Sequence, residues 1–300
     1  MKEGFTARPS PLQIWTLAAR PKTLGAAVAP VLVGTAMAWE AGGFHALAAC
    51  CALLGAVLIQ IGTNFSNDYV DYLKGADTGE RKGPLRVTQA GLVTPSTMKR
   101  ATIAVFALAF LVGLYLIWRG GWPILLIGVL SIISGVLYTV GRYSLAYLGL
   151  ADLFVLIFFG PVAVGGTYYV QALEIDLMVL AVGLAPGLLS TAILLVNNIR
   201  DVEEDRQAGK KTIVVRTGTS FGIGLYVFCV AVAVLIPVGI FLGTGQHPGA
   251  MSVLLVVPLA VPIVKKLRAE SNPTALNPLL GATGRLLLIY SLLFSIGWIV

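Results

Sequence analysis

Long apolar segments separated by short polar connections recur along this chain, and they constrain its fold more than any other feature. A helix needs about 20 residues to cross the hydrocarbon core of a bilayer. Nine segments have a suitable length and composition: residues 12–39, 44–72, 97–118, 122–140, 146–170, 176–200, 220–243, 249–267 and 284–300. Only 12% of the 300 residues are charged, which is about half the fraction found in a soluble protein. The sequence therefore predicts an all-α polytopic membrane protein with nine transmembrane helices, folded as a single domain over residues 1–300.

The first apolar segment is interrupted by Arg20-Pro21-Lys22. Proline fixes its own φ and disfavours a helical conformation in the residue before it, so we expect this segment to form two pieces. Residues 1–11 are expected to be a flexible tail. Two connections stand out by their length and charge, residues 73–96 and 201–219, and long loops in a compact protein are usually functional or disordered.

Basic residues are distributed unequally between the two sides of the predicted bundle. If the N-terminus and the loops after the second, fourth, sixth and eighth helices share one side, that side holds every one of the 21 lysines and arginines except Arg119. The positive-inside rule then places the N-terminus in the cytoplasm and the C-terminus outside. We expect a multi-pass protein of the inner (plasma) membrane with the lipid bilayer as its partner. The net charge of +7 then indicates topology and not a nucleic-acid partner.

Two clusters of acidic and amide side chains follow apolar segments. The first lies in "NFSNDYVDYLKGAD" (64–77), and the second in "LLVNNIRDVEEDRQAGKKT". Steps of three and four residues place each set on one face of a helix. The sets are Asn64, Asn67, Asp68 and Asp71, and then Asn197, Asn198, Asp201 and Asp205. Four predicted helices separate the clusters, so both face the same side of the membrane.

The composition of the clusters predicts Mg²⁺. Each lies at a helix C-terminus, where the helix dipole favours cations, and carboxylate and amide oxygens are ligands for Mg²⁺ rather than for zinc or copper. Asp77 extends the first cluster. Mg²⁺ commonly completes its coordination with phosphate oxygens of a substrate. Two clusters facing one cavity therefore predict two metal sites that hold a diphosphate between them.

Basic residues accompany both clusters and are candidates for contacts with that diphosphate. They are Lys74, Arg81, Lys82, Arg86, Arg142, Arg200 and Lys210.

At these residues the chain resembles the UbiA-type intramembrane aromatic prenyltransferases. The two clusters look like the aspartate-rich motifs at the ends of the second and sixth helices of those enzymes. The stretch "KGADTGERKGPLRVTQAGLVTP", together with "ARPKTL", "LYT", "AYLGLAD" and "GKKTIVVRTG", is similar to the branch that acts on 1,4-dihydroxy-2-naphthoate in menaquinone synthesis. Two positions depart from the wider superfamily: Gly75 stands where a third aspartate is common, and Asp152 where a glutamate is common.

The resemblance implies nine helices around a central cavity, with the active site toward the cytoplasm and a lateral opening to lipid. It implies that Asp68, Asp71, Asp201 and Asp205 bind two Mg²⁺ ions that bridge a polyprenyl diphosphate. The allylic carbon would be attacked by the naphthoate ring, with loss of CO₂ and diphosphate, to give a demethylmenaquinone.

Candidate acceptor contacts lie near the predicted mouth of the site. They are Arg20, Lys22, Tyr138 and Tyr143.

Three alternatives remain open at this stage. A sister prenyltransferase acting on 4-hydroxybenzoate or homogentisate would keep the same fold and metal sites. A secondary transporter would use intramembrane acids to carry ions, although its site belongs nearer the bilayer midplane than these helix ends. A lipid-binding or scaffold protein would tolerate substitution of the aspartates.

Overall fold

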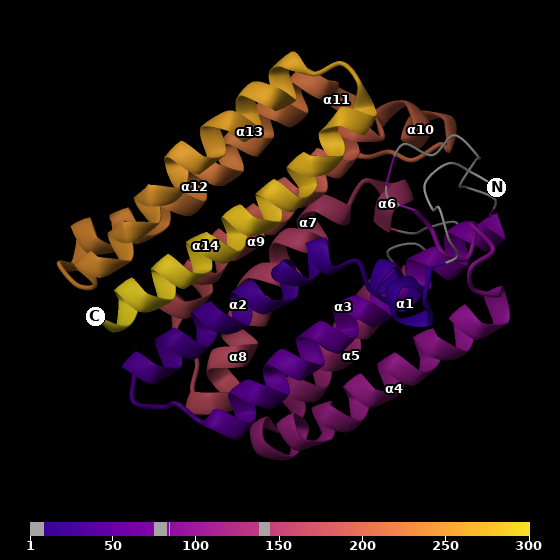
Figure 1. The fold of residues 1–300 in the computed structure, drawn as a ribbon. Coiled ribbons are helices and arrows are strands. Elements are labelled where there is room, and N and C mark those ends of the chain that lie inside the picture. The colour runs from indigo at the N-terminus through magenta and orange to yellow at the C-terminus, as the bar shows by residue number, and fades with distance from the viewer. Residues whose placement is uncertain (1–8, 75–82, 84, 138–144) are drawn as a thin grey trace.

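The computed structural model describes residues 9–74, 83, 85–137 and 145–300, and all regular elements in these ranges are helices (Figure 1). The elements are α1 (Pro11–Ala19), α2 (Pro21–Glu40), α3 (Ala46–Lys74), α4 (Pro95–Gly120), α5 (Trp122–Leu137), α6 (Leu145–Leu148), α7 (Ala151–Ile157), η1 (Phe158–Val162), α8 (Ala163–Ala172), α9 (Leu177–Arg200), α10 (Val202–Gln207), α11 (Ile213–Thr217), α12 (Thr219–Thr244), η2 (Pro248–Val256), α13 (Val257–Ala269), η3 (Pro273–Leu276) and α14 (Asn277–Ile299).

Eight helical stretches of the described residues are long and apolar enough to cross a membrane. They are α2, α3, α4, α7 through α8, α9, α12, η2 through α13, and η3 through α14. The ninth predicted segment, 122–140, corresponds to α5, which is apolar but has only 16 described residues. The prediction of an all-helical, membrane-type fold is confirmed.

The break expected in the first apolar segment is confirmed at Arg20. This residue adopts a left-handed conformation with φ 52°, so α1 ends there and α2 begins at Pro21. Ser10 caps α1, because its side chain accepts from the backbone N–H of Gln13. α1 packs against α3, where Trp15 lies 5.4 Å from Phe65 between ring centroids.

The helix predicted at 146–170 is divided between α6 and α7 at Gly149, which has φ +74°. Two further predicted boundaries differ from the structure. The final helix, predicted as 284–300, begins at Asn277, because Pro278 is compatible with a first helical turn. The connection predicted at 201–219 contains α10 and α11, and the side chain of Thr212 caps α11 by accepting from the N–H of Val215 at 3.3 Å. Both differences lie at polar helix starts, which hydropathy does not detect.

The central helix is α9, which packs against α2, α7, η1, α12 and α14. Glycines permit a close crossing between α9 and the segment around η1. A Cβ atom added at Gly187 would lie 2.3 Å from the carbonyl oxygen of Leu156, and one at Gly160 would lie 2.8 Å from that of Gly183. Gly160 has φ −112° and ψ −115°, and Pro161 follows it, so the helix is kinked where it crosses α9. The crossing joins the end of α7 and η1 to the first half of α9. The start of α7 contacts the second half of α9 through Asp152, whose carbonyl oxygen accepts from Oγ1 of Thr191 and whose Oδ1 accepts from Nδ2 of Asn198, at 3.5 Å each.

Figure 1 shows α6, α10 and α11 at one end of the long helices and the C-terminus of α14 at the other. The clusters of α3 and α9 line one cavity together with Asp205, which belongs to α10. Both clusters therefore lie at the end of the long helices where α10 is found. The fold therefore brings together two polar helix ends that are about 130 residues apart in sequence, as the count of intervening helices predicted.

Candidate active site

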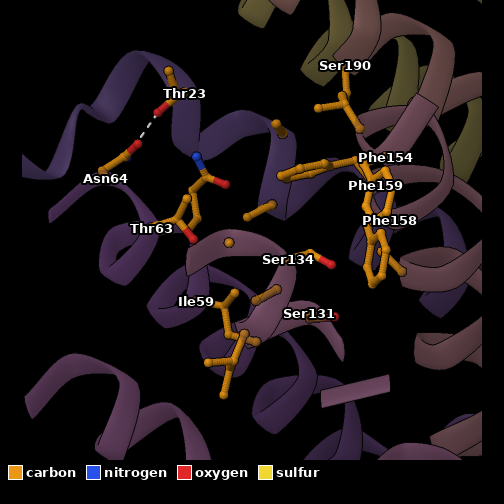
Figure 2. Close-up of a pocket in the computed structure, with 18 of the residues that line it drawn as sticks. Thr23, Ile59, Thr63, Asn64, Ser131, Ser134, Phe154, Phe158, Phe159 and Ser190 are labelled. Carbon is orange, nitrogen blue, oxygen red and sulfur yellow. Dashed lines mark hydrogen bonds between the residues drawn. The ribbon is translucent and has the colours of Figure 1, made fainter. Parts of the chain in front are cut away.

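A cavity of about 480 Å³ lies among the helices, lined by residues of α2, α3, α4, α5, α7 through α8, and α9. Much of its wall is apolar and aromatic. Figure 2 shows Phe154, Phe158 and Phe159 on one side and Ile59 on another. The rings of Phe154 and Phe158 are stacked, with centroids 5.8 Å apart. This part of the cavity is suited to an apolar chain.

Charged and amide side chains line one end of the same cavity, here called the polar end. It is formed by Arg20, Asn64, Asn67, Asp71, Arg86, Asn197, Asn198, Arg200, Asp201, Asp205, Lys210 and Thr212. Seven of these residues come from the two predicted metal clusters, and three are predicted diphosphate contacts. The structure therefore brings most described members of the two sets into one place.

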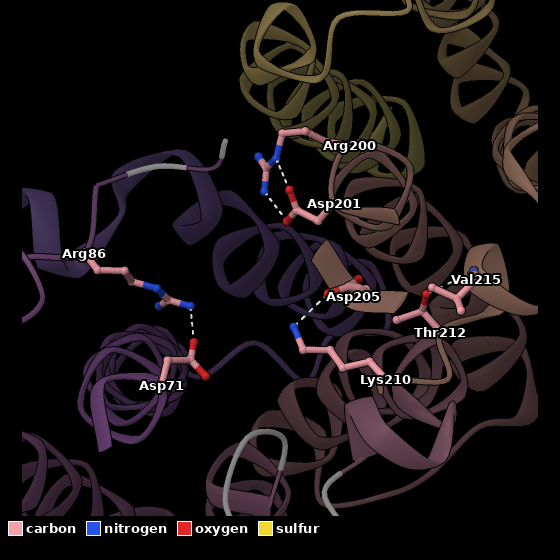
Figure 3. Close-up of polar contacts among 8 residues, drawn as sticks. All are labelled: Asp71, Arg86, Arg200, Asp201, Asp205, Lys210, Thr212 and Val215. Carbon is pink, nitrogen blue, oxygen red and sulfur yellow. Dashed lines mark hydrogen bonds and ion pairs between the residues drawn. The ribbon is translucent and has the colours of Figure 1, made fainter. Parts of the chain in front are cut away.

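Among the residues that the structure describes, three ion pairs form at the polar end, and each joins an acid of a predicted metal cluster to a predicted diphosphate contact (Figure 3). The pairs are Asp71 with Arg86, Asp201 with Arg200, and Asp205 with Lys210. Both guanidinium–carboxylate bonds of the second pair measure 2.6 Å, and Nζ of Lys210 lies 2.8 Å from Oδ1 of Asp205. Each carboxylate therefore has a cationic partner within the protein.

The pKa values of the third pair reflect both the burial of the two groups and the charges around them. Burial raises the pKa of Asp205, and Lys210 opposes this effect. Burial alone would lower the pKa of Lys210, but Asp205 raises it, with further contributions from Asp71 and Asp201. Since Asp71 belongs to α3, the field at Lys210 comes from both clusters. Lys210 therefore remains a cation in the middle of the polar end.

Two asparagines have their amide orientation fixed by neighbours. Nδ2 of Asn64 donates to the carbonyl oxygen of Ala19 at 2.9 Å and to Oγ1 of Thr23 at 3.2 Å. A carbonyl can only accept, so the assignment of Nδ2 follows from chemistry. Nδ2 of Asn198 likewise donates to Oδ1 of Asp152, at 3.5 Å. In both amides Oδ1 remains as the atom that can accept or coordinate.

Asp68 occupies a different position from the other acids. Its carboxylate accepts from the backbone N–H groups of Val87 and Thr88, each at 3.1 Å, and the residue is 1% exposed. It is not among the residues that line the cavity.

The remaining predicted contacts are placed as follows. Arg20 lines the cavity, whereas Lys22 is exposed and does not. Lys74 ends α3. Six others lie outside the described residues: Asp77, Arg81, Lys82, Tyr138, Arg142 and Tyr143.

Several polar residues deeper in the cavity were missed by the sequence analysis. Gln60, Thr63, Ser131, Ser134, Thr167 and Ser190 line its wall; Figure 2 shows Thr63, Ser131, Ser134 and Ser190. Gln60 and Thr63 could have been found, because they continue the polar stripe of Asn64 and Asn67 by one helical turn. The serines of α5 gave no comparable signal.

The donor set of the polar end fits Mg²⁺. No group of three or more His, Cys, Asp or Glu side chains in the described ranges is arranged to enclose a metal ion by itself. The donors that line the polar end are carboxylate and amide oxygens carried by separate helices. Mg²⁺ usually takes one or two carboxylates and fills its other positions with water and substrate phosphates. The site is therefore suited to an ion that arrives with an anionic substrate.

Solved structures with the same fold include UbiA homologues of two archaea. The apo homologue from Aeropyrum pernix K1 superposes with a TM-score of 0.69 at 16% sequence identity, covering 93% of this chain and 97% of that one. The homologue from Archaeoglobus fulgidus bound to GPP and Mg²⁺ superposes with a TM-score of 0.60 at 17% identity, covering 94% and 99%. At this identity the likeness shows the fold alone.

Sequence comparison extends over nearly the full chain. It is 40% identical to a 1,4-dihydroxy-2-naphthoate octaprenyltransferase of Escherichia coli (strain K12), covering 95% of this chain and 94% of the relative. It is 38% identical to one of Mycobacterium tuberculosis, covering 93% and 94%, and 32% identical to one of Bacillus subtilis, covering 99% and 96%. The sequence model of the UbiA prenyltransferase family matches residues 27–296. The chain therefore belongs to the UbiA prenyltransferase family.

Proposed function

We propose that this protein transfers a polyprenyl group from polyprenyl diphosphate to 1,4-dihydroxy-2-naphthoate, in menaquinone biosynthesis. The observation that carries the proposal is the 40% identity, over 95% of the chain, to an enzyme of that name. The site agrees with it chemically. One cavity combines an apolar, aromatic wall with an end rich in carboxylates, amides and bases, which matches a substrate with a long hydrocarbon chain and a diphosphate.

The reaction forms a bond between the allylic carbon of the donor and a carbon of the naphthoate ring. The bond between that allylic carbon and the diphosphate oxygen breaks, and diphosphate leaves with the electron pair. The carboxylate leaves as CO₂, and the electron pair of its bond stays with the ring. Overall the ring exchanges its carboxylate for the prenyl group, with no net gain or loss of protons. The product is a demethylmenaquinone in its reduced, quinol form, so no external oxidant or reductant is needed.

The acids and amides of the polar end are proposed to hold two Mg²⁺ ions, one at each cluster. The ligands would come from Asn64, Asn67, Asp71, Asn197, Asn198, Asp201 and Asp205. Mg²⁺, when bound, would supply positive charge where the leaving diphosphate becomes more negative. The fixed amide orientations of Asn64 and Asn198 leave an oxygen available in each case.

The bases of the three ion pairs are proposed to bind the diphosphate. Arg86, Arg200 and Lys210 each form an ion pair with one carboxylate in the structure. With Mg²⁺ and a diphosphate bound, these carboxylates would have the metal ion as a partner and the three bases would have phosphate oxygens, so that every charge would keep a partner. Arginine and lysine both form strong, charge-assisted bonds to phosphate.

The wall of the cavity is proposed to shield the allylic cation. Aromatic faces attract a nearby cation, and Phe154, Phe158 and Phe159 supply such faces. An apolar wall also excludes water that would otherwise capture the cation. We further propose that nine helices cross the membrane, with the N-terminus and the polar end toward the cytoplasm and the C-terminus outside. The basic residues gather on the side of the N-terminus, which is the cytoplasmic side by the positive-inside rule.

An acceptor panel tests the proposed function. Purified protein in detergent is incubated with a polyprenyl diphosphate, Mg²⁺ and each of 1,4-dihydroxy-2-naphthoate, 4-hydroxybenzoate and homogentisate, and the products are identified by mass spectrometry. We expect a prenylated product from the naphthoate with the mass of one CO₂ lost, none with EDTA, and recovery when excess Mg²⁺ is restored. Product from either other acceptor alone would overturn the acceptor assignment, and no product from any acceptor would overturn the enzyme class.

A further inference from the structure

Asp68 and Asp71 lie three residues apart on α3, but their carboxylates have different surroundings. Asp71 lines the cavity and pairs with the side chain of Arg86. Asp68 is 1% exposed and does not line the cavity, and its two oxygens are both engaged by backbone. Oδ2 accepts from the N–H of Val87 and Oδ1 accepts from the N–H of Thr88, at 3.1 Å each.

The segment that Asp68 contacts is a hydrogen-bonded turn that begins at Arg86. The N–H of Ala90 donates to the carbonyl of Arg86 at 2.9 Å, and that of Gly91 donates to the carbonyl of Thr88 at 3.1 Å. Gly91 has φ +71°, which allows the chain to reverse. The first N–H groups of such a turn lack partners within it, as at a helix N-terminus, and a carboxylate is well suited to satisfy them.

The turn is anchored on apolar residues as well. Val87 is fully buried and belongs to a small core with Phe65 of α3 and Ile14 and Ala18 of α1. Arg86 therefore projects toward the polar end from a backbone fixed on two sides, by the Asp68 carboxylate and by this core. Moving Asp68 onto a metal ion would leave two buried N–H groups without an acceptor, which is costly.

We propose that Asp68 is a positioning residue, whose carboxylate fixes the backbone at Val87 and Thr88 so that the guanidinium of Arg86 is held at the diphosphate site. The two acids of α3 then have different roles. Asp71 contacts the polar end directly, and Asp68 acts through Arg86. This inference rests on the proposed function only in taking the ligand of Arg86 to be a prenyl diphosphate.

The first test needs no substrate, and it compares the wild-type protein with one variant. Hydrogen exchange of the wild-type protein without added metal should show the amides of Val87 and Thr88 protected relative to the rates of the same amides in an unstructured peptide. In Asp68→Asn at least one of the two bonds is lost, because an amide NH₂ cannot accept, and exchange at these amides should be about tenfold faster or more. Rapid exchange in the wild-type protein, or unchanged exchange in the variant, would overturn the proposal.

The second test asks whether Asp68 acts through Arg86. The probe is farnesyl thiodiphosphate, a poorly reactive donor analogue, and its Kd is measured by calorimetry with Mg²⁺ for the wild type, Asp68→Asn, Arg86→Ala and the double variant. We expect Asp68→Asn to weaken binding about tenfold in the wild-type background and less than about twofold in Arg86→Ala. Equal factors in both backgrounds would show an independent ligand and overturn the proposal.

Neither test uses an acceptor. A wrong acceptor assignment would therefore leave both results interpretable, while the acceptor panel would fail separately.

Discussion

The variant Asp201→Asn is expected to lower the rate of prenyl transfer by about 10²- to 10³-fold, the usual loss when one group that stabilises transition-state charge is removed. Asp201 is the second cluster's acid at the end of α9, and it lines the polar end of the cavity. Asparagine keeps its size and can still accept one bond from Arg200, but it lacks the negative charge that would hold a divalent cation. Turnover is measured with saturating 1,4-dihydroxy-2-naphthoate and Mg²⁺.

This variant needs a folding control, because Arg200 is only 3% exposed and loses the negative charge of its partner Asp201. Arg200 still donates to Oδ1 of Asn277 at 2.9 Å, so we expect the variant to fold, and its thermal unfolding in detergent checks this.

Asp205→Asn serves as a second variant. Its partner Lys210 is closer to solvent, so the loss of the ion pair should disturb the fold less. The matched control is Glu203→Gln, an exposed neighbour that pairs with Arg206, and it should retain wild-type turnover. Wild-type turnover in a folded Asp201→Asn or Asp205→Asn protein would contradict the metal assignment.

The variant Lys210→Met is expected to raise the KM for the prenyl diphosphate about 10- to 100-fold, the value of one hydrogen bond to a charged group. Methionine keeps much of the length of the side chain but removes the ammonium. Lys210 lines the cavity, and the acids of both clusters raise its pKa, so it is the cation placed between them. The KM for 1,4-dihydroxy-2-naphthoate should change by less than about threefold if the acceptor binds elsewhere in the cavity.

The adjacent Lys211 provides a matched control for this measurement. It is exposed and does not line the cavity, so Lys211→Met should leave both KM values close to those of the wild type. Equal effects of the two substitutions would indicate that only general positive charge matters and would contradict a specific role for Lys210.

The features that could be predicted from sequence are those that follow from local periodicity. Apolar runs predicted the long helices, and Pro21 predicted the break at Arg20, which the structure confirms. The position of the two stripes of acids and amides on the same side of the membrane could be predicted by counting the helices between them. That prediction needs no knowledge of how the helices pack. The polar end of the cavity contains both stripes.

Other features depend on contacts between distant segments, and periodicity does not carry that information. Asp68 shares a helix face with Asp71 in the sequence pattern. Its carboxylate nevertheless accepts hydrogen bonds from the backbone N–H groups of Val87 and Thr88, about 20 residues later in the chain. The orientation of the Asn198 amide depends on Asp152 of α7. The short helices α10 and α11 form in a connection that reads as a charged loop, since caps and tertiary packing, more than propensity, stabilise such short pieces.

The central feature of the proposed site is that metal and diphosphate bind together through both clusters, and this can be measured directly. Calorimetry would measure the affinity of farnesyl thiodiphosphate for the wild type, Asp71→Asn and Asp201→Asn, each with Mg²⁺ and with EDTA. We expect strong binding to the wild type only with Mg²⁺, and a loss of about tenfold or more in each variant, because one acid comes from α3 and the other from α9. Binding that is equally strong in EDTA, or wild-type affinity in either variant with Mg²⁺, would contradict a metal–diphosphate site shared by the two clusters.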